Sequence, residues 1–267
     1  LRCFRIRNIV DEAFVQRAYS AVVPASIKKR KDIISSYNDG ETALLVVDGM
    51  GAEYYPLLLS LAKQNGINVV EQLLVCTSMP SSTQFNDIPW NADMRLQDVK
   101  RTDTISHMGY SAHEKCSYED NLAEIFRVFR KDVLPRILIG LKDHKRVLVT
   151  ADHGASYLAV LAHKNKMNKT LPWNGSPNDW RYAALDKAIE TPDGMISDYH
   201  AKEQKTYYIV KGYNRLPKEG GKEYALHGGA TLEEMLVPFV VFTKDTVTKP
   251  IEELVEQLIE NDDFDFL

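Results

Sequence analysis

Short apolar runs alternate with amphipathic segments along the chain. The apolar runs are rich in Val, Leu and Ile and end at glycine, aspartate or turn-forming residues, as buried β-strands do. Strands are therefore predicted within residues 42–51, 68–77, 145–154, 205–212 and 227–242. The last range should begin with a loop and a short helix, because Thr231 and Glu234 form a T-x-x-E capping box ahead of the apolar stretch.

Two longer segments have the spacing of amphipathic helices. Residues 54–66 are predicted to be helical up to a stop at Gly66. Residues 117–141 predict a long helix, which Pro135 should kink or break. The apolar face of this long helix consists of Leu122, Ile125, Phe126 and Phe129. Because strands and helices alternate, the fold is predicted to be a layered α/β fold.

The central apolar region is flanked by two more polar segments. Residues 1–40 are predicted to connect the domain to a preceding part of a longer protein, and residues 246–267 to form an acidic helix and tail. The domain between them, 41–245, contains a long insertion at 160–225. The basic run at 28–31 favours a solvated helix face over a nucleic-acid groove.

Composition and charge narrow the function classes. The chain has 267 residues, 37 acidic and 33 basic, with a formal net charge of −4, which excludes a uniformly basic, nucleic-acid-coating surface. It has no apolar run long enough to cross a membrane, so no membrane partner is expected. The widely spaced Cys3, Cys76 and Cys116 fit a reducing, cytoplasmic setting without a disulfide framework or a thiolate zinc site.

Polar side chains with metal-binding chemistry stand where predicted strands end. Asp48 closes the first strand, Asp152 and His153 close a later one, and Thr83 begins the helix expected after the second. Ligands of open α/β sheets bind at the carboxyl ends of strands, so these four side chains are expected to converge. Two carboxylates, an imidazole and a hydroxyl suit a four-coordinate zinc ion, and coordination would activate the threonine as a nucleophile.

A second set of ligands is predicted from different elements. Asp103 and His107 lie four residues apart, so a helical turn would place both on one face. His227 lies in a glycine-flanked loop, where the backbone can approach an ion closely. These three side chains would leave an open coordination position, as in catalytic zinc sites. Two divalent ions about 4 Å apart form the clamp used in phosphoryl transfer.

The ordered motifs DG…T…DxxxH…DHG…HG resemble the alkaline phosphatase superfamily, in particular its nucleotide pyrophosphatase/phosphodiesterase-like branch. Within it, "LLVVDGMG", "MPSSTQFN", "VTADHG" and "HGGATLEEMLVPFVVF" resemble the PglZ domain of bacterial phage-defence systems of the BREX and Pgl type. The resemblance covers roughly residues 42–242. It implies an α/β/α sandwich with a central, mostly parallel sheet and a cap insertion.

The resemblance also implies roles for individual residues. Thr83 matches the nucleophile of a P-[ST]-x-T loop, here "PSST", in which Ser81 and Ser82 adjoin it. One metal ion would be shared by Asp48, Thr83, Asp152 and His153, and the other by Asp103, His107 and His227. The implied protein is a cytoplasmic metal-dependent phosphodiesterase or phosphatase with two divalent ions, zinc by preference. Its substrates would be nucleotides or nucleic acid, and other defence-system proteins would be its partners.

Each of these assignments has a plainer alternative. The Asp152–His153 pair could form only a turn with a helix cap. The Asp103–His107 pair could be incidental in a solvated loop, with His113 as the replacement ligand. Tryptophans of the insertion could stack on a base or anchor a small subdomain. For the whole chain, the alternative to an enzyme is a non-catalytic, metal-stabilised interaction module in a defence or signalling complex.

Overall fold

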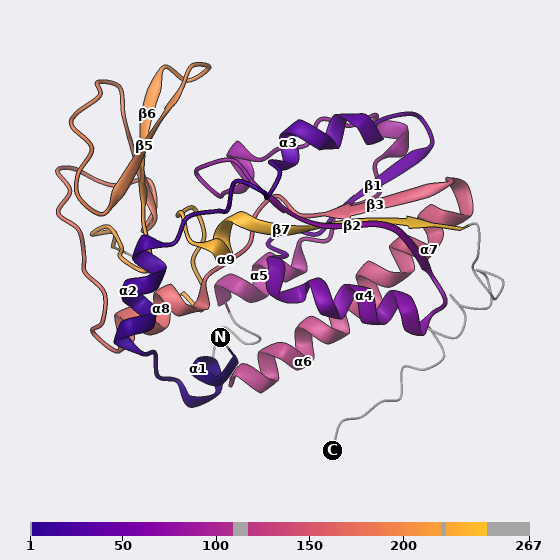
Figure 1. The fold of residues 1–267 in the computed structure, drawn as a ribbon, viewed down its shortest axis with the longest axis horizontal. Helices are drawn as coiled ribbons and strands as arrows, with labels where there is room; N and C mark the ends of the chain where they lie inside the picture. Colours follow the sequence, from indigo (N-terminus) through magenta and orange to yellow (C-terminus); the bar gives the residue numbers. More distant parts are fainter. Residues whose placement is uncertain (1, 109–116, 220–222, 245–267) are drawn as a thin grey trace.

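The computed structural model describes residues 2–108, 117–219 and 223–244. Within these residues, the main sheet has the strand order β1-β3-β7-β2 (Figure 1). Its strands are β1 (Thr42–Val46), β2 (Asn68–Cys76), β3 (Arg146–Thr150) and β7 (Leu236–Thr243). Three of them lie inside the ranges that the apolar runs predicted, β7 extends one residue beyond its range, and every residue of β1 and β7 is buried. The predicted α/β class is therefore confirmed.

The sheet is mixed, which corrects the expectation of a mostly parallel sheet. Among these four strands only β1 and β3 pair in parallel, whereas β7 is antiparallel to both β3 and β2. The chain enters β7 through the one-turn helix α9 (Leu232–Met235). The N–H of Gly154, just beyond β3, donates to the carbonyl of Glu234, just ahead of β7 (2.9 Å). Because β7 starts beside the end of β3, it must run back along it; a parallel partner would need a long crossover.

Helices cover the sheet. Helices α4, α6 and α7 lie on one side of it and α3 on the other (Figure 1). Their bounds are α3 (Arg30–Ile33), α4 (Tyr55–Gln64), α6 (Tyr118–Val128) and α7 (Leu134–Asp143). The predicted long helix is interrupted by a wider π-helical turn, Phe129–Val133, which ends two residues before Pro135. Proline has no N–H to donate to the preceding turn, which explains the break. The complete α/β/α layering stays a prediction.

The chain ahead of the predicted DxxxH pair runs beside β1 without forming a regular strand. Leu96 and Val99 donate backbone hydrogen bonds to carbonyls of β1 (2.8 and 2.9 Å), and Asp48 donates its own N–H to Val99 (2.9 Å). Helix α5 (Arg101–Met108) follows immediately. This pairing places the start of α5 beside the carboxyl end of β1.

A second, smaller antiparallel sheet lies within the predicted insertion, beside the main sheet (Figure 1). It contains β4 (Tyr182–Leu185), β5 (Met195–His200) and β6 (Lys205–Val210). Trp180 is 9% exposed, and its indole N–H donates to the carbonyl of Lys218 (3.0 Å). Trp173 packs on the ring of Tyr208 (centroids 5.5 Å apart). These contacts favour the anchoring role of the tryptophans over base stacking.

The N-terminal helices α1 (Arg2–Arg7) and α2 (Glu12–Ser20) belong to the packed structure. Val10 and Val15 are buried in one apolar cluster with helix α8 (Tyr157–Lys164). The three lysines of the basic run at 28–31 are exposed, as a solvated face predicts, whereas Arg30 is only 5% exposed, which corrects the expectation at that one position. Its guanidinium donates to the backbone carbonyls of Ala151 and Asn86.

Parts of the sequence predictions lie outside the described residues. These are the acidic helix at 246–267 and the alternative ligand His113. The boundaries of the connector (1–40), the domain (41–245) and its insertion (160–225) stay predictions. Among the helices that the structure describes, none has the length and apolar character needed to cross a bilayer.

Candidate metal centre

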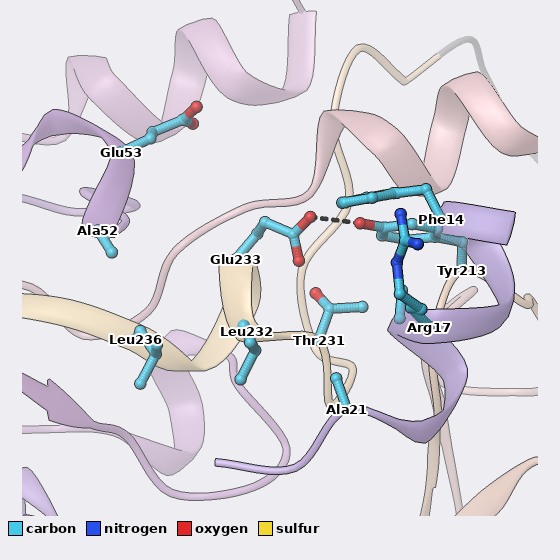
Figure 2. A pocket seen from close by; sticks show the side chains of 11 residues that line it. Phe14, Arg17, Ala21, Ala52, Glu53, Tyr213, Thr231, Leu232, Glu233 and Leu236 are labelled. Atoms are coloured by element: carbon cyan, nitrogen blue, oxygen red, sulfur yellow. Dashed lines mark hydrogen bonds between the residues drawn. The ribbon is translucent and has the colours of Figure 1, made fainter. Parts of the chain in front are cut away.

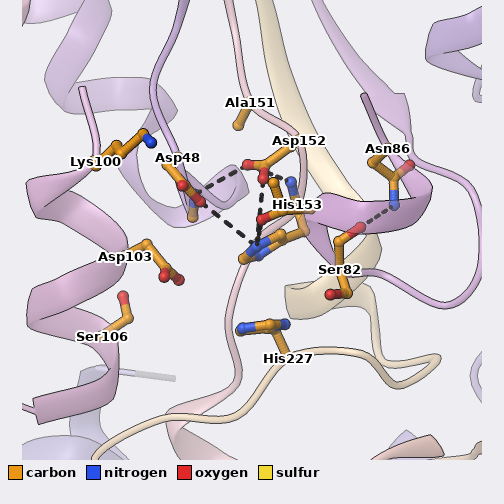
Figure 3. Close-up of polar contacts among 12 residues, drawn as sticks. Asp48, Ser82, Asn86, Lys100, Asp103, Ser106, Ala151, Asp152, His153 and His227 are labelled. Atoms are coloured by element: carbon orange, nitrogen blue, oxygen red, sulfur yellow. Dashed lines mark hydrogen bonds and ion pairs between the residues drawn. The ribbon is translucent and has the colours of Figure 1, made fainter. Parts of the chain in front are cut away.

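The parallel pair β1–β3 brings three of the predicted ligands together (Figure 3). We call Asp48, Asp152 and His153 the strand-end group. Asp48 follows β1 and the other two follow β3. One carboxylate oxygen of Asp152 accepts hydrogen bonds from the backbone N–H of Gly49 (3.2 Å) and of His153 (3.0 Å). The two strand ends are thus tied to each other by a candidate ligand.

Gly49 allows α5 to approach this pair of strand ends. Its φ is +70°, a left-handed conformation that glycine adopts without strain. A Cβ atom added there would lie 3.0 Å from the Cα of Asp103. The DG turn therefore needs glycine for its conformation and for the close packing of α5. This packing brings Asp103 beside the strand-end group.

The ring of His153 is held in one orientation. Its Nδ1 lies 3.1 Å from the carbonyl of Gly154 and donates to it, because a carbonyl can only accept. In the neutral imidazole Nε2 is then the acceptor, and it lies 3.6 Å from an oxygen of Asp48 and 3.5 Å from one of Asp152. Three lone-pair atoms thus face one another, with the imidazole completely buried. This is the arrangement that a histidine metal ligand requires.

The hydroxyl of Thr83 lies beside the same nitrogen, Nε2 of His153. Thr83 begins a single 3-10 turn, η3 (Thr83–Phe85), rather than the predicted helix. Its Oγ1 lies 3.2 Å from Nε2 of His153, although the residue itself is exposed. The two preceding serines are buried, and Ser81 donates its hydroxyl to the carbonyl of Gly229 (2.7 Å). Of the three neighbouring hydroxyls, the one on Thr83 therefore combines access to solvent with contact to a candidate ligand.

The remaining predicted ligands, Asp103, His107 and His227, form what we call the helix–loop group. Nε2 of His107 lies 2.9 Å from Nε2 of His227 and 3.5 Å from an oxygen of Asp103. The other nitrogen of His107 bonds to the carboxylate of Glu223 (3.0 Å). A carboxylate behind a histidine fixes the ring and raises its basicity as a ligand. Glu223 therefore plays here the orienting role that the carbonyl of Gly154 plays for His153.

The loop that carries His227 is fixed from behind by a buried ion pair. Arg181 donates to both oxygens of Glu234 (2.8 Å each), and neither side chain is exposed. The same carboxylate accepts the N–H of Gly229 (3.0 Å) and forms the predicted capping box with Thr231, which is confirmed. A buried ion pair is stable when its remaining hydrogen-bonding atoms are satisfied, as they are here.

Among the residues that the structure describes, two groups of three side chains are close enough to hold a metal ion, with ligand atoms within 4.8 Å of one another. They are Asp48–Asp152–His153 and Asp103–His153–His227. His153 belongs to both, whereas the sequence assigned it to the first ion alone. His107 touches His227 without joining a group of three. The assignment of each side chain to a particular ion stays a prediction.

The electrostatics of these carboxylates fit a bound cation. Oδ1 of Asp48 and Oδ1 of Asp103 are buried without a hydrogen-bond partner. Burial, followed by the charges of Asp152 and Asp103, raises the pKa of Asp48 to about 8. Burial also raises the pKa of Asp103, against the opposing effect of the nearby histidines. A divalent ion would offset both the lost hydration and the mutual repulsion, and this set of nitrogen and carboxylate ligands suits zinc.

Two further side chains are held in the protonation state that binds a metal ion. Burial acts to raise the pKa of Asp152, but His153 and hydrogen bonds to the carboxylate keep that pKa below its usual value. Burial, reinforced by His153 and His107, lowers the pKa of His227 far below its usual range. At neutral pH, Asp152 is therefore ionised and His227 is neutral, as metal ligation requires.

An apolar cavity of about 490 Å³ lies apart from these ligands, between α2 and α9 (Figure 2). Phe14 and Arg17 line one side and Glu233 the other. The hydroxyl of Tyr213 donates to the Glu233 carboxylate (2.5 Å). None of the residues that line this cavity is a candidate ligand, so the cavity does not belong to the cluster of Figure 3.

Sequence reasoning missed the residues that support the ligands. Glu223 lies in a polar stretch with no signal beyond its charge. Arg30 lies far upstream in a basic run, and Asn86 in a polar loop, yet both bond to backbone next to the site. Only the support for His227 had a local signature, which was the capping box of Thr231 and Glu234.

Comparisons with known proteins identify relatives of this chain. A family model described as the BREX system PglZ alkaline phosphatase-like domain matches residues 101–242, a little more than half of the chain. An alkaline phosphatase-like protein PglZ from Bacillus cereus is 24% identical over 177 residues, which cover 62% of this chain and 20% of that protein. The chain thus spans about a fifth of the length of this curated relative. The matched range contains the helix–loop group and the Asp152–His153 pair, while Asp48 and Thr83 lie ahead of it.

Proposed function

The chain belongs to the PglZ family of BREX alkaline phosphatase-like domains, and we propose that it is a metal-dependent hydrolase of phosphate esters with Thr83 as its nucleophile. One observation carries the proposal. The hydroxyl of Thr83, an exposed residue, lies 3.2 Å from the buried Nε2 of His153, at the edge of a cluster of carboxylates and imidazoles. A hydroxyl needs activation to attack phosphorus, and this cluster is where activation would be supplied.

We propose that the cluster holds two divalent ions, zinc by its ligand chemistry. The strand-end group would hold one ion together with Thr83, and the helix–loop group the other. When bound, such ions supply positive charge that lowers the pKa of a nearby hydroxyl and stabilises the charge that develops on phosphoryl oxygens. The unpartnered oxygens of Asp48 and Asp103 support this placement.

The protein's own residues orient the reacting hydroxyl. The Thr83 hydroxyl has one proton to donate, and its contacts with Nε2 of His153 (3.2 Å) and with the Asp152 carboxylate hold it at the edge of the cluster. We propose that the Thr83 oxygen attacks phosphorus, that the ester oxygen leaves, and that water then releases the phosphoryl group from Thr83. The exposure of Thr83 leaves room for the substrate on its outer side.

We propose a phosphodiester as the substrate, with nucleotides or nucleic acid as the natural class. The smaller sheet supports a role of the insertion in substrate choice, because its residues pack against the loop that follows Thr83. The ring of Phe85 meets those of Tyr182 (5.7 Å between centroids) and Tyr207 (4.8 Å). A BREX-type defence complex in the cytoplasm is the proposed setting, with other defence proteins as partners.

The test is turnover of chromogenic phosphate esters by the purified, zinc-loaded protein. We expect hydrolysis of a bis-aryl phosphodiester that a chelator abolishes and added zinc restores. Thr83→Ala should lower kcat on the order of 10³-fold or more, because the nucleophile is removed. Thr104→Ala, an exposed threonine on α5, is the matched control and should keep the activity.

The same measurements contain the outcomes that contradict the proposal. Full turnover by Thr83→Ala would show that another group is the nucleophile. Faster hydrolysis of a monoester than of a diester would correct the substrate class. Tightly bound zinc without turnover of either ester would favour the non-catalytic, metal-stabilised module.

A further inference from the structure

Arg30 is a buried cation bonded to backbone carbonyls rather than to an acid. It is 5% exposed, and its guanidinium donates to the carbonyl of Ala151 and to that of Asn86 (2.6 Å). Within the described part of the chain no carboxylate lies within ion-pair distance of it, and burial lowers the pKa of Arg30 to about 10. Burying a charge without an ion pair opposes folding, so its position indicates a role other than stability.

The two carbonyls belong to the two segments that must meet for the proposed reaction. Ala151 directly precedes Asp152 in the strand-end group. Asn86 ends the segment 78–86, which carries Thr83 and which we call the nucleophile loop. Arg30 lies outside both segments and, by sequence, far from each. Its guanidinium therefore forms a bridge between the end of β3 and the nucleophile loop.

The side chain of Asn86 extends this bridge through the nucleophile loop. Its two amide N–H groups are shared among the carbonyls of Ser78 (3.2 Å), Pro80 (3.1 Å) and Ser82 (3.1 Å). Its amide oxygen accepts the N–H of Ser78 (2.7 Å). The loop is thus wrapped around the side chain of Asn86, and the backbone carbonyl of the same residue accepts a hydrogen bond from Arg30. A displacement of Asn86 would move Ser82 and, with it, the neighbouring Thr83.

We propose that Arg30 is a positioning residue that fixes the nucleophile loop, and with it the hydroxyl of Thr83, against the strand end that carries Asp152. The inference rests on the proposed function, because it concerns the geometry of that reaction. A planar guanidinium can donate to two carbonyls at once from separate nitrogens. The ammonium of lysine has a single nitrogen on a flexible stem and does not reproduce this geometry. A misplacement of a reacting group by about 1 Å costs on the order of 10²-fold in rate.

The first test compares Arg30→Met with Arg5→Met. Arg5 is also buried (8% exposed), but it pairs with Glu53 (2.6 Å) away from the ligands, so its loss should lower stability alone. We expect Arg30→Met to lower kcat per zinc-loaded molecule by about 10- to 100-fold with KM changed less than about threefold. Arg5→Met should keep kcat. A kcat for Arg30→Met within twofold of the unsubstituted protein, or equal losses in both variants, overturns the proposal.

The second test does not depend on turnover and uses Arg30→Lys, which keeps the buried charge. Amide hydrogen exchange is followed in peptides that cover residues 78–86 of the zinc-loaded protein. We expect exchange there to be about tenfold faster in Arg30→Lys and unchanged in Arg5→Met, because only the former loosens the loop. Unchanged exchange in Arg30→Lys overturns the bridge. By contrast, absence of ester hydrolysis by the unsubstituted protein contradicts the proposed function and leaves the exchange result readable.

Discussion

The two halves of the candidate centre are built by different means. The strand-end group stands on β1 and β3, whose parallel pairing fixes the spacing of Asp48 and Asp152 by backbone hydrogen bonds. The helix–loop group stands on the short helix α5 and on a loop, and its His107 is oriented by the side chain of Glu223. Sheet geometry thus determines the positions of the first group before any ion binds. The positions of the second group depend on contacts between side chains.

The difference is also visible in burial. His153 is completely buried and its ring is oriented by a backbone carbonyl. The side chain of His107 is 34% exposed and that of Glu223 is 25% exposed. A site assembled from partly exposed side chains is stabilised less by the fold and more by its ion. Loss of a supporting contact should therefore weaken zinc binding less in the strand-end group than in the helix–loop group. Loss of a ligand should have the larger effect in the strand-end group.

The largest expected effect is that of removing a charged ligand from the strand-end group. Asp152→Asn keeps the shape but loses the charge that holds Thr83 and the strand ends together. We expect kcat/KM for a phosphodiester to fall about 10³-fold, equivalent to several kcal/mol of transition-state stabilisation. Asp103→Asn, its counterpart in the helix–loop group, should cost about 10- to 100-fold. Equal losses, measured together with the zinc content, would contradict the asymmetry between the two groups.

The sequence predicted the strand-end group because its signals are local. Apolar runs give the strands, an acid at the end of each run marks the edge of the sheet, and Gly49 marks the turn that α5 packs against. The direction of the strands had no such signal. β7 is antiparallel because it begins beside the end of β3, and this proximity is set by tertiary packing rather than by local sequence. The structure brings the seven predicted residues into one cluster, while their roles stay predictions.

The supporting residues could not be read from sequence, because their bonds go to distant segments. Arg30 donates to carbonyls at Asn86 and Ala151, and any residue offers a carbonyl, so no residue type marks the contact. Glu223 meets His107 across more than a hundred residues of chain. Such contacts follow from packing rather than from local pattern.

A smaller effect is expected when the carboxylate that orients His107 is replaced. Glu223→Gln removes the charge that orients the ring and raises its basicity, so zinc affinity of the helix–loop group should fall about 10- to 100-fold. The strand-end group should keep its affinity. Zinc titration against a chromogenic chelator measures both, with Glu219→Gln, an exposed acid four residues earlier in the sequence, as the control. Equal weakening of both groups would mean that they bind zinc as one unit.

The smallest effect concerns the metal-free protein and the repulsion within the strand-end group. The pKa of Asp48 is raised from 3.8 to about 8, first by burial and then by the charges of Asp152 and Asp103. A group whose pKa is raised by folding contributes stability that is fully present below its unfolded pKa and lost as pH rises through the folded one. Between pH 4 and 8 the metal-free protein should therefore lose stability at this site, while an Asp48→Asn variant, which does not titrate, should not.

We accordingly expect Asp48→Asn to raise the free energy of unfolding of the chelator-treated protein at pH 8 by roughly 1–2 kcal/mol, and by much less at pH 4. This expected change is smaller than the full free energy that corresponds to the pKa shift, because the Asp48 side chain is 17% exposed and partly hydrated. With zinc the sign should reverse, because the variant loses a ligand. Urea unfolding at both pH values, with and without zinc, measures all four cases, and Asp186→Asn, whose side chain is 85% exposed, is the control. A variant that is less stable than the unsubstituted protein without metal would show that Asp48 is a structural residue of the turn rather than a ligand held ready for a cation.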